Sequence, residues 1–131
     1  KSWRGPFMRW LGGVPVDRSA SHGVVDQAAD LLTDSDGMYL AVAPAGTRSR
    51  AAHWKSGFYH IANTAKVPIV FAFLDVENKV GGVGPGFVPT GDIHADMDKI
   101  RAFYDGMKGF RPELSTVMML KEEMTEEAQA A

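Results

Sequence analysis

Three cationic side chains lie in a short Pro/Gly-containing segment that could bind an anion. Residues 43–50 read Ala-Pro-Ala-Gly-Thr-Arg-Ser-Arg, and the segment continues to Lys55 between an apolar run and a predicted helix. Backbone amides at a turn before a helix can point at an anion, the helix dipole adds positive potential, and Arg48, Arg50 and Lys55 add full charges. This combination favours a phosphate monoester as the ligand. The alternative is a solvated basic loop without a ligand.

Two further sequence blocks flank this segment. Upstream, residues 12–19 indicate a short strand that ends in the pair Asp17-Arg18, and downstream the apolar residues 67–70 open another strand. In this order and spacing the three blocks resemble the glycerolipid acyltransferase family, whose best-known members acylate 1-acyl-glycerol-3-phosphate (lysophosphatidic acid). The resemblance extends from Phe7 to about Glu113.

This resemblance implies a reaction and a set of binding residues. A member of the family moves an acyl chain from coenzyme A or an acyl carrier protein to the hydroxyl of a glycerol-phosphate acceptor in phospholipid synthesis. Arg18 and Arg48 match the positions that hold the acceptor phosphate, and Lys55 is a further candidate for that role. Gly46 and Thr47 are candidates for the same phosphate site, and their backbone amides are also candidates to stabilise the tetrahedral oxyanion. The resemblance implies no metal, and no cofactor beyond the acyl donor.

The chain departs from the family in the residues that carry the chemistry. The family uses a His-x4-Asp signature, in which the His is the general base and the Asp orients it. The residues five positions after the four histidines (His22, His53, His60, His94) are Gln27, Phe58, Ala65 and Lys99. Ala45 also stands where the family has Glu. We therefore assign no catalytic residue from the sequence.

The missing signature has an expected position. The family places it upstream of the Asp-Arg block, and only sixteen residues precede Asp17 here. The chain also begins with Lys1 rather than Met. We therefore expect the chain to be the larger, C-terminal part of the family domain, with its natural start further upstream.

Composition limits the class of protein. The 131 residues are 45% hydrophobic and 23% charged, which is typical of one globular domain spanning residues 1–131. The absence of cysteine excludes disulfides, thiolate metal sites and a cysteine nucleophile. A formal net charge of −2 argues against nucleic acid as a partner.

The charge is unevenly distributed along the chain. Residues 1–60 carry seven Lys/Arg against five Asp/Glu, a net +2, and residues 61–131 carry seven against eleven, a net −4. The basic half could face anionic headgroups or steer a phosphorylated substrate. Ordinary scatter of surface charge is the alternative.

No apolar run approaches the roughly 18–20 residues that cross a bilayer. We therefore expect a cytoplasmic protein or one held peripherally on the membrane. The candidate membrane contact is an aromatic and apolar group near the start of the chain: Trp3, Phe7, Met8, Trp10 and Leu11. The alternative is that these side chains pack in the core or in an oligomer contact.

The hydrophobic pattern alternates between helix and strand. It predicts a helix from Ser21 capped by Ser19 or Ser21, with the stop at 34–37, and then a buried strand at 38–43. A helix over 57–65 and a strand over 67–75 follow. Because a helix between buried strands implies parallel pairing, the fold class is α/β, a mixed and largely parallel sheet flanked by helices and lacking its N-terminal elements.

The second half of the chain contains further elements. The Gly-rich residues 77–86 indicate a hairpin turn before a short strand at 87–89, since their glycines lack the spacing of a dinucleotide loop. Helical periodicity runs from Ile93 to a terminator at Gly109, and a terminal helix covers 113–131. The methionines of these helices indicate core or oligomer packing.

We interpret the groups of histidine and acidic residues as structural rather than as metal-binding or catalytic sites. His94, Asp96 and Asp98 alternate along a helix, so their side chains would not converge on a metal. His53 and His60 have no acidic neighbour in sequence. His22 and Asp26 are four residues apart and form the one imidazole–carboxylate pair that the sequence indicates, although such pairs on helices are usually structural.

Two hypotheses follow from these observations. In the first, the chain is an acyltransferase-family domain acting on an acyl thioester and a lysophospholipid or glycerol-phosphate acceptor. In the second, it is a noncatalytic relative that binds a phosphorylated or lipid ligand or associates with itself, because a missing strand would expose a sheet edge.

Overall fold

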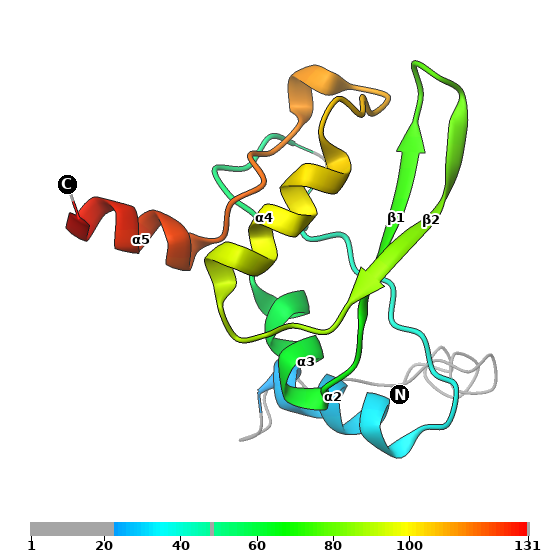
Figure 1. The fold of residues 1–131 in the computed structure, drawn as a ribbon, viewed down its shortest axis with the longest axis vertical. Coiled ribbons are helices and arrows are strands. Elements are labelled where there is room, and N and C mark those ends of the chain that lie inside the picture. The colour runs from blue at the N-terminus through cyan, green and yellow to red at the C-terminus, as the bar shows by residue number, and fades with distance from the viewer. Residues whose placement is uncertain (1–22, 48, 131) are drawn as a thin grey trace, which may run out of the picture.

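The computed structural model describes residues 23–47 and 49–130. In order, the elements are α2 (Val24–Asp34), α3 (Gly57–Ala65), β1 (Ile69–Asp75), β2 (Val80–Phe87), α4 (Ile93–Tyr104), a 3₁₀ turn (Pro112–Leu114) and α5 (Lys121–Ala130). Figure 1 shows α4 running alongside the hairpin and α5 leading away from the other elements. The predicted features at residues 3–19, His22 and Arg48 lie outside the described residues.

The sheet of the described residues has two antiparallel strands, β1 and β2. The expectation of a largely parallel sheet is wrong for this part of the chain. A four-residue connection joins the strands, and the Asp75 carboxylate accepts from both the backbone and side-chain nitrogens of Asn78 within it. So short a connection permits only antiparallel pairing, because a parallel crossover needs a dozen or more residues.

The predicted strand at 38–43 is also wrong, because the structure has no strand there. Tyr39 is 95% exposed and Leu40 is 50% exposed. An apolar run becomes a strand only when a partner satisfies its backbone groups, and among the described residues none pairs with it. The predicted helix from Ser21 begins later, at Val24 with Gly23 as its N-cap residue, and ends at Asp34, inside the predicted stop.

Strand β2 begins at Val80, well before the predicted position of 87–89. Its glycines allow close approach of neighbouring groups. A Cβ on Gly84 would collide with the Phe103 ring, and one on Gly86 would lie 2.9 Å from the Ile69 carbonyl oxygen. The Gly-rich composition therefore lets α4 and β1 approach this strand.

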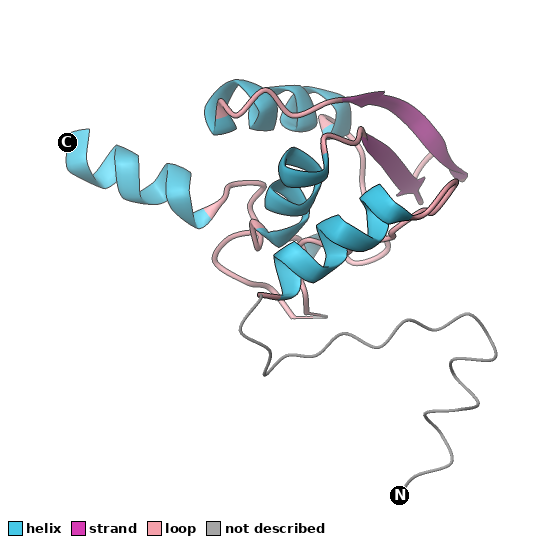
Figure 2. Ribbon diagram, turned by 90° about the horizontal axis from the view of Figure 1, so that it is seen from below, coloured by secondary structure: helices cyan, strands magenta, loops and turns pink. Residues whose placement is uncertain are grey.

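The core lies between the hairpin and α4, and Figure 2 shows the two strands at one side of the helices. The Phe71 ring of β1 stacks on Phe103 of α4 at 4.6 Å between centroids. The buried core residues come from four parts of the chain: Tyr59, Phe71, Met97, Ile100 and Leu120. Separately, α2 packs against α3, and the buried residues of these helices include Ala29 and Ala62.

The helices α3 and α4 were predicted well, and the later elements less so. Helix α3 covers the predicted residues, and α4 starts at the predicted Ile93 but ends at Tyr104, before the left-handed Gly106 (φ +75°). The terminal helix begins at Lys121, because residues 115–120 are extended beside another segment.

Within residues 23–47 and 49–130, no helix combines the length and apolar character needed to cross a membrane.

A buried carboxylate joins α3 to α4. Asp96 is fully buried and accepts from the Tyr59 hydroxyl at 3.0 Å, from the Thr90 amide at 2.7 Å and from the Lys99 ammonium at 2.8 Å. Burial acts to raise the pKa of Asp96, but these donors outweigh it and hold that pKa below its usual range. Burial and the Asp96 carboxylate raise the pKa of Tyr59 to about 12.

We predict that Asp96→Ala lowers the free energy of unfolding by about 2–4 kcal/mol, since it leaves buried donors without their acceptor. Because the folded-state pKa of Asp96 is lowered, this contribution is present at neutral pH and is lost as the pH falls through that pKa. Urea denaturation at several pH values measures it. Asp98→Ala, on the same helix but 74% exposed, is the matched control and should cost less than about 1 kcal/mol.

Candidate functional site

The basic segment folds back on itself into a closed loop. The Gly46 amide donates to the Ala43 carbonyl at 3.0 Å, and the Lys55 amide donates to the Pro44 carbonyl at 2.9 Å. Gly46 adopts φ +63°, a left-handed conformation that favours glycine. The second hydrogen bond brings the end of the loop, where α3 begins, next to its start.

This closure brings Lys55 against Gly46. A Cβ on Gly46 would lie 3.1 Å from Lys55 Cε and 3.2 Å from Nζ, so the Lys55 side chain passes directly over the glycine. Gly46 therefore serves the loop by having no side chain. Its amide is engaged in the turn, where it donates to the Ala43 carbonyl.

Of the other predicted site residues, the structure describes Thr47. Thr47 lies on the exposed part of the loop, where its hydroxyl accepts from the Ser49 amide at 3.1 Å. Thr47, Gly46 and Lys55 are thus brought together, whereas Arg18 and Arg48 lie outside the described residues.

The sequence around the loop is basic, and one carboxylate from a distant part of the chain, Glu122, lies near Ser56 at the start of α3. Between Asp36 and Asp75 the chain has four Lys/Arg and no acidic residue. The first turn of α3 follows Lys55 directly, and the N-terminus of a helix adds positive potential. An anion near the loop would therefore meet attraction from the ammonium group and from the backbone.

The C-terminal segment 116–120 lies beside the loop. The Ala51 amide donates to the Thr116 hydroxyl at 3.1 Å, the Trp54 amide donates to the Met119 carbonyl at 2.8 Å, and Trp54 forms a parallel bridge with Leu120. The Trp54 ring packs edge-on against Phe58 and Tyr104. Two segments more than sixty residues apart in sequence thus form one surface.

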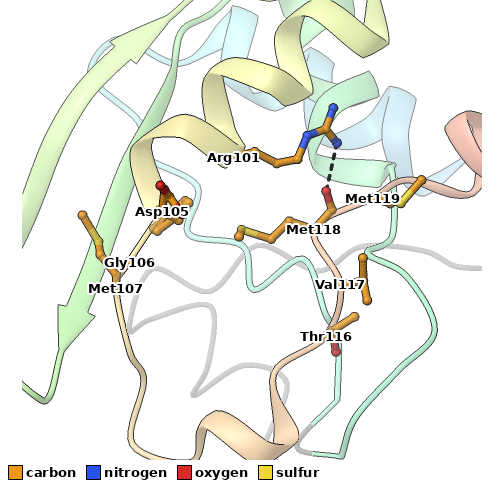
Figure 3. Close-up of a pocket in the computed structure, with 9 residues that line it drawn as sticks. Arg101, Asp105, Gly106, Met107, Thr116, Val117, Met118 and Met119 are labelled. Carbon is orange, nitrogen blue, oxygen red and sulfur yellow. Dashed lines mark hydrogen bonds between the residues drawn. The ribbon is translucent and has the colours of Figure 1, made fainter.

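An open groove of about 550 Å³ adjoins this surface. Figure 3 shows its walls, the end of α4 on one side and the 116–119 segment on the other. Apolar side chains dominate the lining, which consists of Arg101, Tyr104, Asp105, Gly106, Met107, Thr116, Val117, Met118 and Met119. Methionine side chains adapt to irregular apolar ligands because they are unbranched and flexible.

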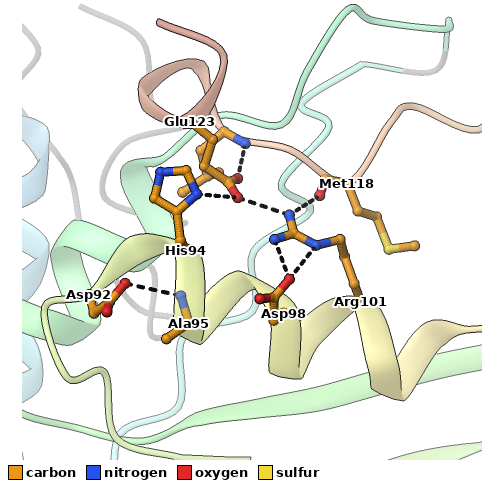
Figure 4. Close-up of polar contacts among 8 residues, drawn as sticks. Asp92, His94, Ala95, Asp98, Arg101, Met118 and Glu123 are labelled. Atoms are coloured by element: carbon orange, nitrogen blue, oxygen red, sulfur yellow. Dashed lines mark hydrogen bonds and ion pairs between the residues drawn. The ribbon is translucent and has the colours of Figure 1, made fainter. Parts of the chain in front are cut away.

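An ion pair between the partly exposed Arg101 and a buried carboxylate fixes the wall of this groove. Arg101 Nη1 donates to Glu123 Oε1 at 2.9 Å and to the Met118 carbonyl at 3.0 Å, and Glu123 is 2% exposed (Figure 4). The second oxygen of Glu123 accepts from the Leu120 amide at 2.7 Å. The His94 Nδ1 atom lies 3.8 Å from the same carboxylate. These contacts fix the start of α5 against α4.

The adjacent residue, Glu122, lies against His60 of α3. Its Oε1 atom is 3.3 Å from His60 Nε2. Sequence reasoning found no acidic partner for His60, because the two residues are 62 positions apart and no local pattern connects them. The residues of the other candidate cluster point apart, since Asp96 binds Tyr59 and Asp98 binds Arg101.

Comparison with known families gives the class of the protein. The model of the acyltransferase family matches residues 2–72, more than half of the chain. The chain belongs to the acyltransferase family, in agreement with the resemblance seen in the sequence. The match includes the basic loop, α2 and α3, and it ends within β1. No curated protein and no solved structure matches the chain.

We predict that Arg101→Ala lowers the free energy of unfolding by about 3 kcal/mol, because it leaves the Glu123 carboxylate buried without its cation. It should also speed hydrogen exchange at the Trp54 amide, since the 118–123 segment loses its anchor on α4. Denaturation and amide exchange measure the two effects. Arg111→Ala is the control, because Arg111 is 69% exposed and should contribute less than about 1 kcal/mol.

Proposed function

We propose that this domain transfers an acyl group from an acyl thioester to the hydroxyl of a glycerol-phosphate-type acceptor, as a step of phospholipid synthesis. The observation that carries this proposal is the closed basic loop with Lys55 lying over Gly46, in a chain of the acyltransferase family. The loop would bind the acceptor phosphate through Lys55, Arg48 and the Thr47 amide, with Arg18 contributing from upstream. A phosphate suits several converging donors, because it presents several charged oxygens.

The groove beside the 116–119 segment would supply the second requirement of the reaction, an apolar surface for an acyl chain. Its 116–119 wall hydrogen-bonds directly to the loop at Ala51 and Trp54. A phosphate on the loop and an acyl chain along Met107 and Met118 would therefore occupy neighbouring positions. Burial of each methylene group contributes about 0.8 kcal/mol, so even partial occupancy of the groove favours lipid substrates.

The donor and the location of the protein belong to the same proposal. The donor is an acyl-coenzyme A or an acylated carrier protein, and no other cofactor takes part. A peripheral position on the cytoplasmic face of a membrane, reached through the aromatic residues near Trp3 and Trp10, would give access to a lysophospholipid.

The anion site is tested by removing its cations. Arg48→Ala and Lys55→Ala should each weaken binding of glycerol 3-phosphate about 30-fold, since a charge-assisted contact of this kind contributes about 2 kcal/mol. Isothermal titration calorimetry at low salt measures the affinity. Lys108→Ala, an exposed cation that pairs with Glu77, is the control and should leave the affinity unchanged. Equal affinities in all four proteins would remove the phosphate site from the proposal.

A second candidate function is self-association, and the outer face of the hairpin favours it. Cross-strand neighbours point to the same face of a sheet, and this face carries Val70, Leu74 and Val83 at 51%, 78% and 74% exposure. The other positions of the face are Ala72 and glycines, so it has no polar side chain. A second copy of the chain would cover such a face.

If this face joins two copies, Leu74→Lys should shift the mass in solution from about twice 14.2 kDa to 14.2 kDa. The charge would be buried without a partner in the dimer but solvated in the monomer. Light scattering coupled to size exclusion measures the mass. Phe110→Lys changes an equally exposed apolar residue outside the face and should leave the dimer intact. A monomer at every concentration of the unmodified chain would rule out this candidate.

A further inference from the structure

The C-terminal segment 116–120 runs alongside the basic loop in a parallel direction. The Ala51 amide donates to the Thr116 hydroxyl and the Trp54 amide donates to the Met119 carbonyl, and 65 residues separate the members of each pair. A parallel bridge joins Trp54 to the residue after Met119. Because the two separations are equal, the segments advance together, and the C-terminal segment follows the second half of the loop instead of touching it at one point.

The two amides that bind this segment lie beside the cations of the loop. In the sequence, Ala51 directly follows Arg50, and Trp54 directly precedes Lys55. The Lys55 amide closes the loop, and the Lys55 side chain passes over Gly46. Contacts that hold these two amides in place therefore also limit where the Lys55 ammonium group can lie.

Thr116 contacts the loop through its side chain. Its hydroxyl oxygen lies 3.1 Å from the Ala51 nitrogen, in a partly buried hydrogen bond. Met119, by contrast, accepts from Trp54 with its backbone carbonyl. A backbone contact remains possible when the side chain is changed, whereas a hydroxyl acceptor is removed by substitution. At Thr116, therefore, the identity of the amino acid decides whether this contact with the loop exists.

The loop and the residue that holds it belong to different parts of the chain. The family model matches residues 2–72, which include the loop, whereas Thr116 lies beyond them. The segment that carries Thr116 is itself fixed to α4, since Arg101 Nη1 donates to the Met118 carbonyl at 3.0 Å. The loop is thus held from α4 through the C-terminal segment.

The order of the loop affects how tightly it can bind an anion. A loop that is already ordered binds more tightly than one that becomes ordered on binding, because ordering costs conformational entropy. Charge-assisted hydrogen bonds also depend on the geometry in which the donors converge. An acceptor for the Ala51 amide serves both needs, since it holds the backbone between Arg50 and Lys55 in one arrangement.

We propose that Thr116 is a positioning residue of the phosphate site, because its hydroxyl holds the Ala51 amide and so preorganises the cationic part of the loop. This inference rests on the proposed function. Thr116 also lines the groove, as Figure 3 shows, so one residue contacts both the surface for the acyl chain and the loop for the phosphate.

The test measures the affinity of the whole 131-residue chain for glycerol 3-phosphate by isothermal titration calorimetry. This probe has no acyl chain, so its affinity reports on the loop and not on the groove. Thr116→Val keeps the size of the side chain but removes the hydroxyl, and it should weaken binding about fivefold, the net effect of one hydrogen bond. Thr116→Ser keeps the hydroxyl and should retain the unmodified affinity.

Thr33→Val is the matched control. The Thr33 hydroxyl donates to the Ala29 carbonyl at 2.9 Å, and this hydrogen bond is also partly buried. The same exchange of a hydroxyl for a methyl group should leave the affinity for glycerol 3-phosphate unchanged there, because the lost bond lies within α2 and not at the loop.

Hydrogen exchange provides a second measurement on the unmodified chain. Saturating glycerol 3-phosphate should slow exchange at the Ala51 and Trp54 amides, because a bound phosphate stabilises the loop in the arrangement that the C-terminal segment holds. Without ligand, the Ala51 amide should exchange faster in Thr116→Val than in Thr116→Ser.

Each contrary outcome has a distinct meaning. If Thr116→Val binds as tightly as the unmodified chain while Arg48→Ala and Lys55→Ala bind more weakly, the inference is overturned and the proposed function stands. Equal weakening by Thr116→Ser or by Thr33→Val also overturns the inference, because the Thr116 hydroxyl then has no specific role. An unmodified chain that does not bind glycerol 3-phosphate overturns the proposed function and the inference together. If circular dichroism shows that Thr116→Val is unfolded, exchange at Ala51 that saturating ligand leaves unchanged overturns the inference.

Discussion

The ion pair between Arg101 and the buried carboxylate of Glu123 holds the residues that follow α4 against that helix. Its guanidinium joins α4 to the start of α5 and also binds the Met118 carbonyl. The 116–120 segment is thereby fixed where it can meet the loop at Ala51 and Trp54. An ion pair with a buried member adds little stability relative to apolar residues of similar volume, but leaving the buried Glu123 carboxylate without its cation is costly. This pair therefore determines where the segment lies more than how stable the domain is.

Two buried carboxylates connect the helices of the domain. Asp96 joins α3 to α4 in the same way that Glu123 joins α4 to α5. Each carboxylate accepts several hydrogen bonds, which repays the loss of hydration that burial imposes. Two acidic residues thus connect the three helices: Asp96 joins α4 to α3, and Glu123 joins α5 to α4.

Local patterns in the sequence predicted the local parts of the structure. Helix α3 and the start of α4 follow from apolar spacing within one segment, and the basic loop follows from its own residues. The features that local patterns predicted wrongly or missed depend on partners far away in the sequence. The apolar run 38–43 has the composition of a strand, but a strand also requires a neighbour, and composition does not supply one. Likewise, the pairing of His60 with Glu122 depends on the position of α5, which Arg101 sets from α4.

The two adjacent glutamates of α5 show how one long-range contact positions another. Both lie in the first turn of the helix, where negative charge is favoured by the helix dipole. Neighbouring helix positions point about 100° apart, so Glu123 can face Arg101 while Glu122 faces α3. With Glu123 held by Arg101, Glu122 lies on the side of α5 where it contacts His60. A carboxylate beyond the matched segment thus contacts a histidine within it, without any sequence pattern that connects the two.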